Sequence, residues 1–259
     1  MRALVTNDDG IDSVGLLVLA SAAVKAGLDV VVAAPAEQCS GASASITAVR
    51  RDGRTLVNRR ELPDLPDVEA WAVEAQPGHI VVAALNGWFD PVPDLVLSGI
   101  NHGANVGRAI LHSGTVGAAL TAGINGRSAL AVSLDVPLHP ERDPLWDAGE
   151  ELLPRVLQLL QDAPAGTVLS LNVPDLPPDR HGDLREARLA DFGTVHARVD
   201  EVEDGGLYLG EVEVSTEPEE GTDSALLAAG HPTITALHSV AEDPSDLVRD
   251  WLASEDTRA

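Results

Sequence analysis

The chain has 259 residues, 44% of them hydrophobic and only 3% aromatic, so it is long enough to bury a substantial core built mainly from aliphatic side chains. Its 17 basic and 41 acidic side chains give a formal net charge of −24, which argues against a nucleic-acid partner because phosphate backbones would be repelled. The single cysteine, Cys39, cannot form an intramolecular disulfide and favours a reducing compartment. The first residues lack a signal-peptide pattern and no apolar run reaches about 18–20 residues, so we expect a cytoplasmic protein without membrane contact.

Strand-like and helix-like segments alternate along the first 174 residues. Buried strands are predicted where short apolar runs occur, at 2–6, 28–34, 68–74, 93–99, 128–134 and 166–174. Helices are predicted from periodicity and capping signals, at 13–27, 78–87, 113–126 and 145–163. A hairpin is expected at 46–59, because Asp52-Gly53 is a typical two-residue turn, and Pro154 should disturb the last helix. This alternation predicts an α/β protein whose largely parallel sheet is covered by helices on both faces.

The proline-rich segment 174–183 is the best domain boundary, because it suits neither a helix nor a strand. We therefore divide the chain into a core of residues 1–175 and a C-terminal region of residues 176–259. The C-terminal region is predicted to hold an extended hairpin with Gly205-Gly206 near its turn, followed by a helix, a strand and a terminal helix, at 197–214, 222–230, 232–238 and 243–255. Much of the acidic surplus lies here and indicates a solvated surface.

Polar, glycine-bearing loops follow three of the predicted core strands. They have the sequences TNDDG, EQCSGAS and SGINHGAN, at 6–10, 37–43 and 98–105. Ligands bind beyond the carboxyl ends of the strands in open α/β sheets, so we expect these loops to meet at one site.

These loops carry hard oxygen donors: the carboxylates of Asp8 and Asp9, the hydroxyl of Ser40, and the amides of Asn101 and Asn105. Such donors suit Mg²⁺ or Mn²⁺, whereas zinc is disfavoured because no HExxH or CxxC spacing is present. An isolated Asp-Asp-Gly is more often a solvated turn with a helix cap. The three loops together favour a cation, since it would offset the repulsion between the adjacent carboxylates.

The stretch Ser113, Gly114, Thr115 opens the predicted helix at 113–126, where free N–H groups and the helix dipole favour a phosphate. A simple serine cap with close packing is the commoner explanation of such a stretch. His102 and His112 flank the loops and are candidate general acids, although loop histidines are more often solvated. No P-loop, GxGxxG or GxSxG motif is present, which argues against the sites that those motifs build.

Seven stretches resemble the SurE family, the stationary-phase survival proteins that are metal-dependent 5′/3′-nucleotidases. They run in order along nearly the whole chain and read VTNDDGIDSVG, VVAAPAEQCSGASASIT, PDLVLSGINHGANVG, SGTVGAAL, LAVSL, LNVPDLP and GTDSALLAAGHPTIT. The combination of NDDG, SGINxGxN and SGTV is highly specific. The resemblance implies a three-layer Rossmann-like sandwich, with a C-terminal β-hairpin arm that forms a homodimer or homotetramer.

The resemblance also implies roles for individual residues. One divalent cation per subunit, Mg²⁺ or Mn²⁺, would be held by Asp8, Asp9, Ser40 and Asn101. Groups on the phosphate side would be Asn105, Ser113, Gly114 and Thr115. The loops would be shaped by Asn7, Gly10, Gly41 and Gly99. Asp8 and Asp9 are also the expected catalytic residues: the cation would polarise the phosphoryl group and activate a water for in-line attack, which Asp9 would help to orient.

The expected reaction is hydrolysis of nucleoside 5′-monophosphates, with 3′-monophosphates as further substrates. Some positions depart from the family pattern: Arg108, Ala109 and His112 stand where acids and a tyrosine are usual. The candidate substrate contacts are His102, Arg108 and His112. The departures from the family pattern at 108, 109 and 112 leave the choice of substrate open. A non-nucleotide phosphate ester or short polyphosphate is the alternative substrate. A metal-dependent transferase and a catalytically silent nucleotide binder are less favoured.

Overall fold

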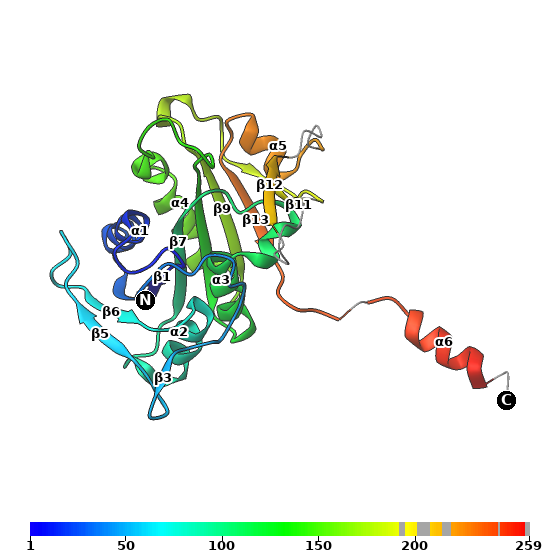
Figure 1. Cartoon of the computed structure of the whole chain (residues 1–259), viewed down its shortest axis with the longest axis horizontal. Helices are drawn as coiled ribbons and strands as arrows, with labels where there is room; N and C mark the ends of the chain where they lie inside the picture. Colours follow the sequence, from blue (N-terminus) through cyan, green and yellow to red (C-terminus); the bar gives the residue numbers. More distant parts are fainter. Residues whose placement is uncertain (192–194, 201–207, 214–218, 243, 257–259) are drawn as a thin grey trace.

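The computed structural model describes residues 1–191, 195–200, 208–213, 219–242 and 244–256, with side chains through 1–191, 219–242 and 244–252. A nine-stranded sheet forms its centre (Figure 1). Its strands are β1 (Arg2–Thr6), β2 (Asp29–Pro35), β5 (Val57–Arg60), β6 (Glu69–Val73), β7 (Leu95–His102), β8 (Ser128–Asp135), β9 (Val168–Pro174), β10 (Arg185–Glu186) and β13 (Thr233–Leu237). Their order across the sheet is β10-β13-β9-β8-β7-β1-β2-β6-β5.

The six central strands, from β9 to β6, are all parallel to one another. Strands β1, β2, β7, β8 and β9 are buried along almost their whole length, which explains their continuous apolar sequences. Antiparallel pairing occurs only towards the edges of this sheet, where β5 joins β6 and β13 joins β9. The mostly parallel sheet predicted from the sequence is therefore confirmed.

Helices cover both faces of the sheet. The longer elements are α1 (Val14–Lys25), α2 (Pro77–Ala83), α3 (Gly114–Ile124), α4 (Leu153–Asp162), α5 (Asp223–Ala228) and α6 (Leu247–Asp256). Short 3₁₀ turns and one π-helical turn are η1 (Ala84–Trp88), η2 (Gly107–His112), η3 (Trp146–Gly149) and η4 (Pro178–Arg180). Helices α1 and α4 share one apolar core, and α2 and α3 share the other on the opposite face. The sheet and the helices on its two faces are therefore the three layers of a Rossmann-like sandwich, with one apolar core on each side of the sheet.

Two predicted helices differ from the observed ones. The segment 145–163 is not one helix: it forms η3 and then α4, whose first turn contains Pro154. A proline is well accommodated there because its missing N–H has no intrahelical partner at that position. The segment 78–87 continues from α2 into η1, and the helical backbone is broken at Gly87, where φ is +94°.

The hairpin predicted at 46–59 is confirmed as β3 (Arg50–Arg51) paired antiparallel with β4 (Arg54–Thr55). Asp52 and Gly53 both have positive φ, of 53° and 76°, as a two-residue turn with left-handed backbone requires.

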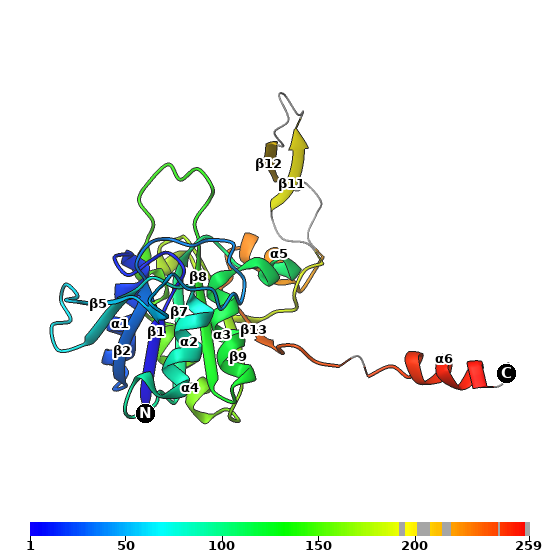
Figure 2. The ribbon, with the colours of Figure 1, turned by 60° about the horizontal axis from the view of Figure 1, so that its bottom comes forward.

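The C-terminal region contributes to the same sheet as the core. Strand β13 pairs with β9 so that Thr233 lies opposite Asn172, and β10 pairs with β13. The division at residue 175 stays a prediction, and the sheet itself continues across it. A second ribbon, β11 (Val195–Asp200) with β12 (Tyr208–Glu213), projects from the body (Figure 2). The predicted turn at Gly205-Gly206 lies outside the described residues.

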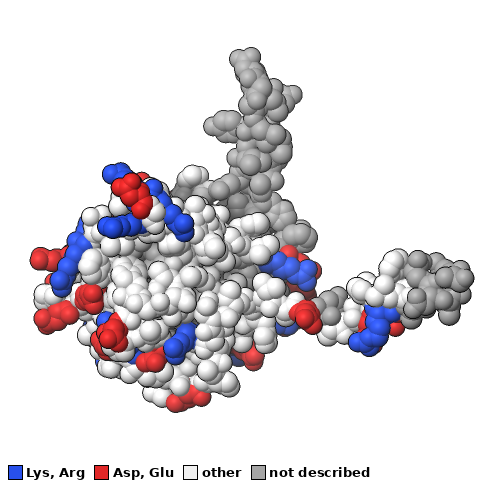
Figure 3. All heavy atoms as spheres, turned by 90° about the horizontal axis from the view of Figure 1, so that it is seen from below, with Lys and Arg blue, Asp and Glu red and all other residues white. Residues whose placement is uncertain are grey.

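Helix α6 lies apart from the rest of the molecule at the end of an extended segment (Figures 1 and 2). Among the residues that the structure describes, no helix is both long and apolar enough to cross a bilayer. Figure 3 shows acidic and basic side chains interspersed around a largely uncharged area on one face. On that face the net charge of −24 therefore does not appear as a uniform acidic surface.

Candidate active site

The polar loops predicted from the sequence meet at the carboxyl ends of the central strands. The chain builds β2 and β6 on one side of β1 and then returns to build β7, β8 and β9 on the other side. This reversal makes the ends of β1 and β7 the topological switch point, where ligands bind in open α/β sheets. Asp8 and Asp9 follow β1, and Asn101 lies near the end of β7.

Asp8 is the most enclosed carboxylate of the site, with 4% of its surface exposed. The hydroxyl of Thr115 donates a short hydrogen bond to Asp8 Oδ1, and the same hydroxyl lies 3.2 Å from Asn101 Oδ1. Gly114 is required beside it, since a Cβ on that residue would lie 2.6 Å from Asp8 Oδ2. The ends of β1 and β7 and the first turn of α3 therefore converge on one carboxylate.

Asp9 is more open and contacts the other two loops. The backbone N–H of His102 donates to Asp9 Oδ2 at 3.2 Å. The amide of Gln38 donates to Asp9 Oδ1 at 3.4 Å and to Ser40 Oγ at 3.0 Å. The predicted ligands Asp9 and Ser40 are thus linked through a glutamine to which the sequence analysis assigned no role.

Burial raises the pKa of both carboxyl groups. For Asp8, hydrogen bonds from the Thr115 hydroxyl and from the backbone N–H groups of residues 114 and 115 partly offset this effect. For Asp9, burial and then the charge of Asp8 raise the pKa from 3.8 to about 6. Burial and the charges of both aspartates also raise the pKa of the Cys39 thiol to about 12. Two carboxylates that resist ionising together are what a bound cation would stabilise.

The first loop is held by its own side chains. Asn7 donates to the carbonyl of Gly10 at 3.1 Å and to Ser13 Oγ at 2.6 Å, and it accepts from the Gly10 N–H at 3.2 Å. Gly10 has φ of +102°, a backbone conformation that L side chains rarely adopt. The Cys39 N–H then donates to the Asp8 carbonyl at 2.8 Å, which joins the first loop to the second.

The second loop packs against the start of α3. Ser43 donates from its hydroxyl to the Leu111 carbonyl at 2.6 Å and from its backbone to the His112 carbonyl at 3.2 Å. Gly117 permits this contact, because a Cβ there would lie 2.5 Å from the Ser43 backbone. Gly41, which was predicted to shape this loop, has φ of +76°.

The third loop begins at Gly99, which has φ of +134° and sits so close to β8 that a Cβ would lie 2.3 Å from the Val132 carbonyl. Farther along, the Asn105 side chain donates to Ser133 Oγ at 2.8 Å. Its backbone exchanges hydrogen bonds of 2.8 and 2.9 Å with the side chain of Asn172. Asn105, predicted on the phosphate side, is therefore held in place by the ends of β8 and β9.

Ser113 caps α3, as its hydroxyl accepts from the Val116 N–H at 3.0 Å. The serine-cap explanation of this residue is thus confirmed, while its role towards a phosphate stays a prediction. The first amides of α3 face the Asp8 carboxylate, so a phosphate held near Asp8 would also lie near this helix N-terminus.

The three candidate general acids or substrate contacts differ in their surroundings. His102 donates its backbone N–H to Asp9 and its ring lies 6.0 Å from that of Trp146. His112 is exposed, and its carbonyl binds the second loop. Arg108 forms an exposed ion pair of 3.0 Å with Asp191, and none of its described contacts involves Asp8 or Asp9.

Asp223 is a buried carboxylate that the sequence analysis did not single out. Only 1% of its surface is exposed, and it accepts from the N–H groups of Gly107, Ala190 and Ser224 at 2.7–3.0 Å. It ties the loop before α3 to the C-terminal region. The sequence feature that could have pointed to Asp223 is its place in the stretch GTDSALLAAGHPTIT, which resembles the family.

The donor set fits a hard divalent cation. Within the described part of the chain, no three His, Cys, Asp or Glu side chains form a metal-binding group. The ligands predicted from the resemblance are the carboxylates of Asp8 and Asp9 with neutral oxygens from Ser40 and Asn101. Such a mixed oxygen set suits Mg²⁺ or Mn²⁺ rather than zinc.

Comparison with known proteins shows the family of the chain. The model of the Survival protein SurE family matches residues 3–197, which is well over half of the chain. The chain belongs to the SurE family. A protein of Marinomonas sp. (strain MWYL1) named 5′-nucleotidase SurE is 35% identical, and the alignment covers 92% of each chain.

Two further SurE proteins extend the comparison. A protein of Proteus mirabilis (strain HI4320) named 5′/3′-nucleotidase SurE is 34% identical, with 97% of this chain and 96% of that protein covered. The crystal structure of the SurE protein from Aquifex aeolicus superposes with a TM-score of 0.78 at 26% identity, covering 98% of this chain and all of that one. The SurE resemblance and the Rossmann-like fold expected from the sequence are both confirmed.

Proposed function

We propose that the protein hydrolyses nucleoside 5′-monophosphates, with 3′-monophosphates as further substrates, to a nucleoside and inorganic phosphate. The observation that carries the proposal is the Asp8 carboxylate, enclosed at the first turn of α3 and next to Asp9. A buried carboxylate pair at a helix N-terminus suits a site that holds a cation and a phosphate together. The names of the relatives favour nucleotides over the other phosphate esters considered.

Asp8, Asp9, Ser40 and Asn101 would hold one divalent cation, Mg²⁺ or Mn²⁺. A cation bound there supplies positive charge that offsets the charge developing on the phosphoryl oxygens. Thr115 orients Asp8 through its hydrogen bond to Oδ1.

The remaining steps use groups of the chain itself. The N-terminus of α3, at residues 113–115, would hold phosphoryl oxygens through its N–H groups and dipole, with Asn105 beside it. Asp9 would accept a hydrogen bond from the attacking water. The water oxygen then bonds to phosphorus and passes a proton to Asp9, while the bond from phosphorus to the nucleoside oxygen breaks. The released oxygen takes up a proton, for which His102 is the candidate donor.

We also propose that the protein works in the cytoplasm as a homodimer or homotetramer. The single cysteine supports a reducing compartment. The set-apart helix α6 exposes large apolar side chains that a second copy would cover, namely Leu247, Val248, Trp251 and Leu252.

A phosphate-release screen tests the proposed reaction. Purified protein is incubated with the four common nucleoside 5′-monophosphates, their 3′ isomers and several non-nucleotide phosphate esters, in Mg²⁺, Mn²⁺ or excess chelator. We expect release from nucleotides that depends on the cation. Release that survives complete chelation would contradict the metal-dependent reaction, and binding without release would favour a silent nucleotide binder.

A further inference from the structure

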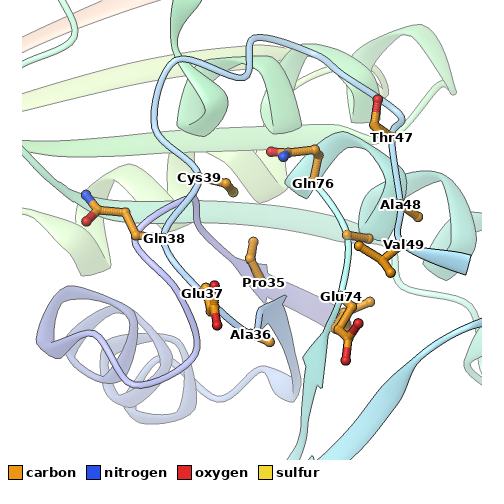
Figure 4. Close-up of a pocket in the computed structure, with 12 residues that line it drawn as sticks. Pro35, Ala36, Glu37, Gln38, Cys39, Thr47, Ala48, Val49, Glu74 and Gln76 are labelled. Carbon is orange, nitrogen blue, oxygen red and sulfur yellow. The ribbon is translucent and has the colours of Figure 1, made fainter.

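A pocket of about 440 Å³ lies beyond the carboxyl ends of β2 and β6, beside the candidate active site (Figure 4). Its volume falls within the range of small-molecule sites, about 300–1,000 Å³. It opens where the two strands separate, just after the Ala36 N–H donates to the Val73 carbonyl at 2.8 Å. The pocket therefore lies at the edge of the sheet where the strands end.

One wall of the pocket is a short backbone ribbon. The Val49 N–H donates to the Glu74 carbonyl at 2.8 Å, and the Gln76 N–H donates to the Thr47 carbonyl at 3.0 Å. These bonds hold segment 47–49 against segment 74–76. The opposite wall is the second active-site loop, residues 35–39.

The pocket and the carboxylate pair share this second loop. Gln38 and Cys39 both line the pocket, while the Gln38 side chain points away from it and binds Asp9 and Ser40 on the other side (Figure 4). A ligand that filled the pocket would therefore lie against the loop that carries Ser40 and contacts Asp9.

The side chain of Gln76 carries a hydrogen-bond acceptor that a ligand could satisfy. Its side-chain Oε1 is fully buried, and no described residue donates a hydrogen bond to it. Although Gln76 occupies the N-cap position of α2, its side chain does not cap the helix. Figure 4 shows its amide projecting towards Cys39 from the facing wall. A buried acceptor without a donor is costly, so a ligand N–H group would be favoured here.

Two carboxylates complete the lining. Glu37 and Glu74 come from the two facing walls, and an ionised carboxylate can only accept hydrogen bonds (Figure 4). Glu37 follows β2 by two residues. In Rossmann-type nucleotide sites, an acidic residue at the end of the second strand binds the ribose hydroxyls.

We propose that this pocket binds the nucleoside part of the substrate, with the Gln76 amide contacting the edge of the base and Glu37 contacting the ribose. The assignment rests on the proposed nucleotidase function and makes Gln76 a specificity-determining residue. Exocyclic amino groups and ribose hydroxyls are donors, so they would match the acceptors Gln76 Oε1 and Glu37.

Steady-state kinetics on Gln76→Leu test the assignment, with ribose 5-phosphate as the substrate that lacks a base. Losing a buried hydrogen bond to the base should lower kcat/KM for a nucleoside monophosphate by about 10-fold or more. The value for ribose 5-phosphate should stay within about 2-fold, which also shows that the variant is folded. Gln158→Leu, on the exposed face of α4, is the matched control and should change neither value.

An equal loss on both substrates, or no loss on either, would overturn the pocket assignment while the proposed reaction stands. If the wild-type protein hydrolyses none of these substrates, the proposed function fails, and calorimetry with adenosine, guanosine, cytidine and uridine decides the pocket separately. Binding of one of them that Gln76→Leu abolishes would support the assignment, and absence of binding to the wild-type protein would overturn it.

Discussion

Thr115 donates its hydroxyl hydrogen bond to the carboxylate of Asp8, which precedes it by 107 residues. The bond joins the end of the first strand to the first turn of α3, the two elements on which the proposed chemistry depends. It also favours the ionised form of Asp8 against the effect of burial.

Replacing Thr115 with valine should therefore impair catalysis more than folding. Valine keeps the shape of threonine but cannot donate, and losing the partner that orients a ligand typically costs about 10–100-fold in activity or metal affinity. We expect kcat/KM for a nucleoside monophosphate to fall by that amount. Thr115→Ser retains the hydroxyl and should recover most of the activity; equal activity in the valine and wild-type proteins would contradict the role assigned to the bond.

Gly114→Ala should displace Asp8, because the new methyl group would lie 2.6 Å from Asp8 Oδ2. We expect phosphate release to fall by at least 100-fold, since small displacements of catalytic groups are costly. Gly126→Ala, just beyond the same helix, is the control. Its φ is +73° with open space around it, so the change should lower the melting temperature through backbone strain and leave kcat unchanged. A Gly114→Ala protein that releases phosphate at the wild-type rate would exclude tight packing of α3 on Asp8.

Asp223→Asn should destabilise the fold. Asp223 accepts three backbone hydrogen bonds in a buried position, and asparagine would turn its amide donor towards one of those N–H groups. We expect the free energy of unfolding in urea to fall by about 2–4 kcal/mol. Asp191→Asn removes only an exposed ion pair with Arg108 and should change the free energy of unfolding by less than about 1 kcal/mol. Equal effects of the two changes would rule out the anchoring role of Asp223.

Asp135, at the end of β8, should make stability depend on pH. Burial, and then the charge of Asp175, raises the pKa of Asp135 above 3.8, and Arg142 pairs with Asp175 at 3.0 Å. The folded state therefore holds a proton that the unfolded state has released, so stability falls as pH rises from about 4 through the folded-state pKa. The Asp135→Asn protein has no carboxyl group to titrate at this position, so it should not lose stability in this way as pH rises. Its free energy of unfolding relative to wild type should increase over that pH range, and a constant difference from pH 4 to 8 would refute the prediction.

Local patterns in the sequence were sufficient to predict most of the fold. Continuous valine-rich runs such as Asp29–Pro35 indicate strands buried on both faces, and Asp52-Gly53 indicates a tight turn, since both follow from short-range sterics and burial. The break before α4 was placed incorrectly, because a proline in the first turn of one helix resembles a proline that disturbs a longer helix.

The candidate site could be predicted only in part from the sequence, because its contacts are not local. The residue types and loops around Asp8 and Asp9 indicate a cation, but the contacts that orient them join distant positions. Gln38, Asn172 and Asp223 act through hydrogen bonds across 29, 67 and 116 residues respectively. No local pattern specifies such partners, since they become neighbours only after the strands have been ordered in the sheet.

The central claim is that the carboxylates after β1 hold a divalent cation, and counting bound Mn²⁺ by equilibrium dialysis tests it most directly. We predict one Mn²⁺ per wild-type chain, and binding at least about 100-fold weaker in Asp8→Asn, since a direct ligand should matter more than an outer partner. Asp12→Asn, an exposed aspartate in the same segment, should bind Mn²⁺ like the wild type. Wild-type affinity in Asp8→Asn, or no Mn²⁺ bound to the wild-type protein, would contradict the claim.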